Sequence, residues 1–124
     1  MDTSTDQYDD ALYDATEPLA CTINAAEVPD HIALIERIRT NMVSIERTRH
    51  GVLIHLPRNE ANVADARQFA TEEKQCCEFW GFDVIEQPAL ALRWDGPPET
   101  AEFMDRLIGY FEGREPIGTL FGFL

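Results

Sequence analysis

The sequence has little positive charge and no long apolar run, and each shortage removes a class of function. Ten Lys and Arg stand against 23 Asp and Glu in 124 residues, which gives a formal net charge of −13. Such a chain repels phosphate backbones and anionic membranes, so we expect neither as a partner. No apolar run reaches the roughly 18 to 20 residues of a membrane helix, and the N-terminus lacks the basic and hydrophobic regions of a secretion signal. We therefore expect a cytoplasmic protein.

The acidic charge is concentrated at the N-terminus. Residues 1–20 contain six acids and no Lys or Arg, and they show little apolar periodicity, which is typical of a disordered arm. We expect one folded domain over residues 21–112. The tail, residues 113–124, ends in the apolar stretch "GTLFGFL", and we expect it to pack on the domain or on a second subunit of a homodimer.

Hydrophobic periodicity predicts an α+β fold. A short helix over "PDHIALIERIRT" precedes two ββα units. The first unit has strands over "MVSIERT" and "GVLIHL" and a helix from about residue 60 to 77 or 78; the second has strands over "FDVIEQ" and "ALALRWD" and a helix after "GPP". Asn59 is the expected N-cap of the long helix. The two units together predict an antiparallel four-stranded sheet with helices packed on one face.

The chain has three cysteines, Cys21, Cys76 and Cys77, so a framework in which every cysteine is paired is excluded. Adjacent residues on a helix point about 100° apart, so a bond between Cys76 and Cys77 would be strained. Near a fraying helix end both sulfurs can turn toward one large, soft ion. Cys21 is the only candidate for a third thiolate.

The residues around the cysteines resemble those of a widespread family of short, mostly uncharacterised bacterial proteins. These proteins begin their domain with "CT" and end a long helix with "ExxCC" followed by aromatics, here Cys21-Thr22, Glu73 to Cys77, and Phe79, Trp80 and Phe82. The match runs from about Cys21 to Phe111. The family commonly has Pro after "CC" where this chain has Glu78. The resemblance implies mercury or other soft-metal resistance, hence a site for Hg(II), Cu(I), As(III) or Zn(II).

Two alternatives to metal binding stay open. A more distant likeness, to the ββα units of organomercurial lyases and copper-delivery proteins, suggests catalysis: Cys77 with Cys21 or Cys76 would hold mercury, and Glu73 or Asp83 would protonate the leaving carbon. Thiol redox chemistry would use the same cysteines, although the lyase motifs themselves are absent. Otherwise the cysteines are inert core residues of an interaction domain, because free cysteine is often buried.

Overall fold

The computed structural model describes residues 10–13 and 28–121, apart from the side chains of Val28, Cys76 and Phe121. The elements are helix α1 (Val28–Asn41), strands β1 (Ser44–Arg47) and β2 (Gly51–Leu56), helix α2 (Glu60–Cys76), strands β3 (Gly81–Ile85) and β4 (Leu90–Asp95), the 3₁₀ helix η3 (Pro98–Thr100), and helices α3 (Ala101–Phe111) and α4 (Gly118–Phe121). This order confirms the predicted α+β fold with two ββα units. None of the described helices is long and apolar enough to cross a membrane.

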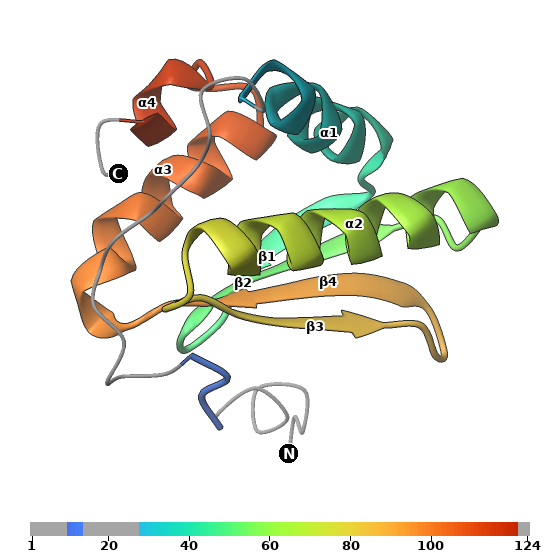
Figure 1. Ribbon diagram of the computed structural model, residues 1–124, viewed down its shortest axis with the longest axis horizontal. Coiled ribbons are helices and arrows are strands. Elements are labelled where there is room, and N and C mark those ends of the chain that lie inside the picture. Colours follow the sequence, from blue (N-terminus) through green and yellow to red (C-terminus); the bar gives the residue numbers. More distant parts are fainter. Residues whose placement is uncertain (1–9, 14–27, 122–124) are drawn as a thin grey trace.

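The four strands form one antiparallel sheet in the order β1-β2-β4-β3. The helices lie on one face of this sheet, and residues 10–13 lie on the other (Figure 1). In the register Val52 and Phe82 both face Trp94, and Ile54 and Val84 both face Leu92. Cross-strand partners share a face, so these residues build the face beneath the helices.

Local signals explain where the two helices before β3 begin. Pro29 lies in the first turn of α1, where a backbone N–H has no partner within the helix and its absence costs little. The Asn59 side chain accepts a hydrogen bond of 2.8 Å from the backbone N–H of Asn62, which confirms Asn59 as the N-cap of α2. Helix α2 ends at Cys76, so Cys77 and Glu78 follow it rather than continue it.

The core is organised around an aromatic cluster beneath the helices. Trp94 is 1% exposed, and its ring centroid lies 5.3 Å from those of Phe69, Trp80 and Phe82 and 5.7 Å from that of Phe103. These rings come from α2, β3, α3 and the segment before β3. The cluster therefore joins the two ββα units into one packed layer.

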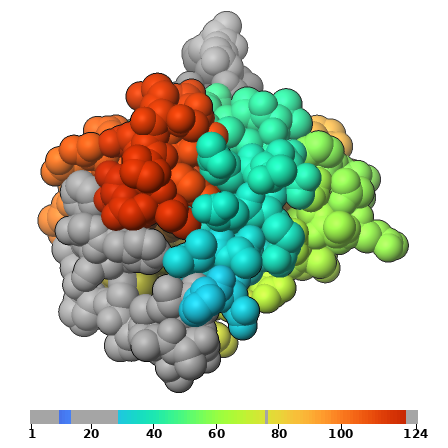
Figure 2. All heavy atoms as spheres, turned by 90° about the horizontal axis from the view of Figure 1, so that it is seen from above, coloured from blue at the N-terminus to red at the C-terminus, as the bar shows by residue number. Residues whose placement is uncertain are grey.

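The apolar tail packs on its own domain where it is described. Leu120 of α4 is 5% exposed and belongs to the main core, and in Figure 2 α4 lies beside α1 on the helical side of the molecule. Residues 122–124 of the tail lie outside the described residues. No second copy is needed to cover Leu120, and a homodimer stays a prediction.

Part of the sheet face opposite the helices is covered by residues 10–13, which belong to the predicted acidic arm; that the arm as a whole is disordered stays a prediction. The backbone N–H of Leu12 donates to Asp95 at 3.2 Å, and Arg93 donates to the carbonyl of Asp10. A Cβ atom at Gly81 would lie only 2.3 Å from the Leu12 carbonyl carbon, so this strand start must be glycine for the segment to approach. The rest of the arm lies outside the described residues.

Candidate functional site

The predicted cysteine site lies where α2 turns into β3. Cys77 is 2% exposed, and its backbone N–H donates to the carbonyl of Glu73 at 2.8 Å, one helical turn earlier. The N–H of Trp80 donates to the Cys77 carbonyl at 3.1 Å. The Lys74 ammonium folds back over the helix end and donates to the carbonyls of Glu78 and, at 2.7 Å, Trp80. Lys74 thus pairs with two carbonyls of the turn that links α2 to β3.

Cys77 is part of a disulfide bond, which differs from the free thiols that we expected. The chain contains two other cysteines, Cys21 and Cys76, and the side chains of both lie outside the described residues. One disulfide uses two of the three cysteines, so one cysteine lies outside this bond. The disulfide shows that a second sulfur lies against Cys77. Which cysteine supplies it, and whether Cys21 belongs to the site, stay predictions.

A buried acid and an imidazole lie one turn before Cys77. The side chain of Glu73 is 8% exposed and that of His31 14%, and His31 Nε2 forms a short hydrogen bond with Glu73. On the other side of the ring, His31 Nδ1 lies 3.4 Å from a carboxylate oxygen of Glu72. The ring stacks on Phe69 at 5.3 Å and 7°. Helix α1 therefore places a histidine against the acid that we expected nearest the thiols.

The position of His31 could have been predicted from its spacing along the helix, although the histidines of the chain show no metal-ligand spacing. His31 precedes Leu34, Ile35 and Ile38 by three, four and seven residues, which is the spacing of a single helix face. These three side chains are buried. A histidine in that row has to lie over the core, where it needs a hydrogen-bond partner.

The hydrogen bond that His31 donates to the Glu73 carboxylate raises the pKa of His31, and burial opposes the rise. The charge of Glu73 and the hydrogen bond and charge of Glu72 add smaller increases. The imidazolium form is therefore more stable in the folded protein than in the unfolded chain. A raised folded-state pKa adds stability in full below the unfolded pKa of about 6.5, and this stability is lost as pH rises through the folded-state pKa.

We expect the free energy of unfolding to fall as pH rises from about 6.5, because His31 loses its proton in the folded state. Urea titrations across that range, with the disulfide kept intact, would measure the slope. In Glu73→Gln the slope should flatten. Glu72→Gln serves as the matched control, since Glu72 makes the longer contact, and should keep most of the slope. Equal slopes in the wild type and Glu73→Gln would contradict this assignment.

The structure separates Asp83, the other predicted acid, from Cys77. Asp83 is exposed and pairs in register with Arg93 on β4. Its neighbour Phe82 contacts Phe69 of α2 beneath the helices, and successive strand residues point to opposite faces. Asp83 therefore faces away from the helical layer that contains Cys77. Only Glu73 of the two acids lies within one helical turn of that cysteine.

The aromatics that follow the cysteines belong to the core. Phe79 is 2% exposed and Trp80 is fully buried, and their ring centroids are 4.4 Å apart. Trp80 also packs against Phe103 of α3, at 5.1 Å. Both rings belong to the same buried cluster as Cys77, and little water reaches the Cys77 side chain.

The described residues alone do not form a metal site. Within residues 10–13 and 28–121, no group of three or more His, Cys, Asp or Glu side chains could hold a metal ion. A metal site would therefore need the cysteines whose side chains are not described. Comparison with known proteins assigns no family: no family model, no curated protein and no solved structure matches the chain.

Proposed function

We propose that the chain, once its disulfide is reduced, binds a soft thiophilic ion through Cys77 and at least one further cysteine, for sequestration or transfer. The observation that carries this proposal is the disulfide at Cys77. Two sulfurs that can bond to each other already converge on one point. Reduction would leave two thiols within reach of a single ion, which is enough for Hg(II) or Cu(I), whereas As(III) or Zn(II) would need further ligands.

The surroundings of Cys77 favour a soft ion over a hard one. Cys77 belongs to the buried apolar core, and thiolates are the ligands that soft metals prefer. Binding of Hg(II) by two thiols gives a neutral dithiolate and releases two protons, so no net charge is left in the core. A third thiolate, from whichever of Cys21 and Cys76 is not the disulfide partner, would complete a trigonal site.

The direct test is retention of Hg(II) against a competing monothiol. The full chain is reduced with a dithiol, separated from it without air, loaded with one equivalent of Hg(II) and challenged with excess monothiol before native mass spectrometry. Only an ion held by two or more thiolates should survive the challenge, because a single thiolate exchanges with the competitor. The wild type should retain one ion, and Cys77→Ser should retain none.

The other two cysteines then define the site. Loss of retention in Cys76→Ser alone indicates a pair of adjacent thiolates, loss in Cys21→Ser alone indicates a pair closed by the N-terminal segment, and loss in both indicates three ligands. Full retention in Cys77→Ser would overturn the proposal. A wild type that retains no ion but is reversibly reduced by the dithiol and reoxidised would instead favour thiol redox chemistry, the alternative that the disulfide itself supports.

A further inference from the structure

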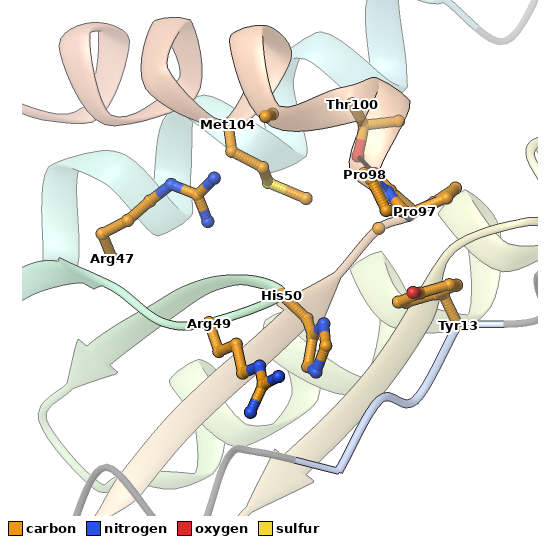
Figure 3. A pocket seen from close by; sticks show the side chains of 10 residues that line it. Tyr13, Arg47, Arg49, His50, Pro97, Pro98, Thr100 and Met104 are labelled. Atoms are coloured by element: carbon orange, nitrogen blue, oxygen red, sulfur yellow. Dashed lines mark hydrogen bonds between the residues drawn. The ribbon is translucent and has the colours of Figure 1, made fainter.

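A cavity of about 390 Å³ opens between the β1–β2 turn and the start of α3. Arg47 extends from the end of β1 toward Met104 of α3, and Arg49 and His50 belong to the turn (Figure 3). Tyr13, from the described N-terminal stretch, packs edge-on against the His50 ring at 5.7 Å. The cavity is therefore built from three parts of the chain that are far apart in sequence.

The charge of this cavity is opposite to that of the protein. Of the ten described residues that line it, three are Arg or His and none is acidic, although acids outnumber Lys and Arg by 23 to 10 in the chain. A concave surface lined by one sign of charge concentrates ligands of the other sign. The lining therefore favours an anion.

The two arginines of the cavity differ in their contacts: Arg47 is held in place by the backbone, and Arg49 is available to a ligand. Arg47 Nη1 donates to the carbonyls of Gly51 at 2.7 Å and Thr48 at 3.0 Å, which fixes the side chain. Its Nε lies 3.6 Å from Asp105, an exposed carboxylate that water screens. Arg49 is exposed and forms no hydrogen bond or ion pair with the residues that the structure describes. Its guanidinium can therefore meet a ligand without first breaking another contact.

The remaining walls define the rest of the ligand. Pro97 and Pro98 stand at the entrance to α3 and have no backbone N–H, so side chains must provide most of the donors. The proline rings, Met104 and the Tyr13 ring offer apolar surface. We propose that this cavity binds a small organic phosphate with an apolar or aromatic part. A dianionic phosphate gains more from an arginine-lined wall than a carboxylate with one charge does.

The test uses phenyl phosphate as the probe, followed by backbone amide NMR shifts of the full chain. Saturable shifts should be centred on His50, Gly96 and Ala101, which line the cavity. Arg49→Gln should weaken the apparent Kd about tenfold, the cost of losing one charge-assisted contact. Arg67→Gln is the matched control, since Arg67 is an exposed arginine of α2 that pairs with Glu86, and it should bind as the wild type does.

Benzoate tests the chemical class, because it keeps the ring and replaces the phosphate with a carboxylate. It should bind several-fold more weakly than phenyl phosphate at the same ionic strength. The proposal is overturned if phenyl phosphate gives no saturable shifts, if Arg49→Gln and Arg67→Gln weaken binding equally, or if benzoate binds as tightly as phenyl phosphate. None of these measurements depends on the redox state of the cysteines, provided that it is held constant.

Discussion

Replacing Asp95 by alanine should lower the free energy of unfolding by about 3–5 kcal/mol, because it leaves a buried charge without its partner. Asp95 is fully buried and Arg93 is 5% exposed. Their closest contact, from Arg93 Nη2 to Asp95 Oδ2, is 2.8 Å. The Asp95 carboxylate also accepts the Leu12 N–H, so the substitution also removes one of the hydrogen bonds between the N-terminal stretch and the sheet. Urea denaturation monitored by tryptophan fluorescence would measure the loss.

Two variants make this prediction specific. Asp83→Ala removes an exposed acid from the neighbouring strand and should change stability by less than about 0.5 kcal/mol. Arg93→Met combined with Asp95→Leu removes both charges and should recover much of the loss, since an apolar pair can replace a buried ion pair. A loss below about 1 kcal/mol in Asp95→Ala would mean that the pair is more hydrated than its burial indicates.

Replacing Trp94 by alanine should cost a similar amount, about 3–5 kcal/mol, for a different reason. The side chain contacts four aromatic rings from different elements, so its removal opens a cavity that the rigid sheet cannot close. Trp94→Phe should cost clearly less, because the indole N–H has no hydrogen-bond partner among the described residues and phenylalanine loses only ring volume.

Thermal unfolding followed by circular dichroism would separate these two variants. Loss of packing around Trp94 should also loosen Trp80, which is in contact with it, and should therefore increase the accessibility of Cys77 to a thiol reagent after reduction. Equal destabilisation by Trp94→Ala and Trp94→Phe would contradict the cavity argument and would point to an essential polar role for the indole.

The fold could be predicted because its signals are local. The Asn59 cap, the glycine between the first two predicted strands and the apolar run of β2 each specify structure within a few residues. Strand ends were less well defined: β1 starts at Ser44, two residues later than predicted, and β4 starts at Leu90, one residue later. Where a strand begins and ends depends on its partner strand, and a short stretch of sequence does not reveal where that partner lies.

The contents of the site could be predicted only in part. The position of Cys77 at the end of α2 and its proximity to Glu73 follow from helix geometry. The pairing of Glu73 with His31 joins residues 42 positions apart, and no helical or strand period relates them. The basic cavity was missed for the same reason, since Tyr13, Arg49 and Met104 converge only after the whole chain has folded.

The N-terminal stretch, residues 10–13, is expected to join the fold late. The contacts of Asp10 with Arg93 and of Leu12 with Asp95 each span 83 residues, and pairings of such sequence separation form late because a long loop must close first. During synthesis the first residues leave the ribosome long before β4 exists to receive them. Until β4 is complete, Arg93 and Asp95 are not in place to bind residues 10–13, so the docking of this stretch is expected to be the closing step of folding.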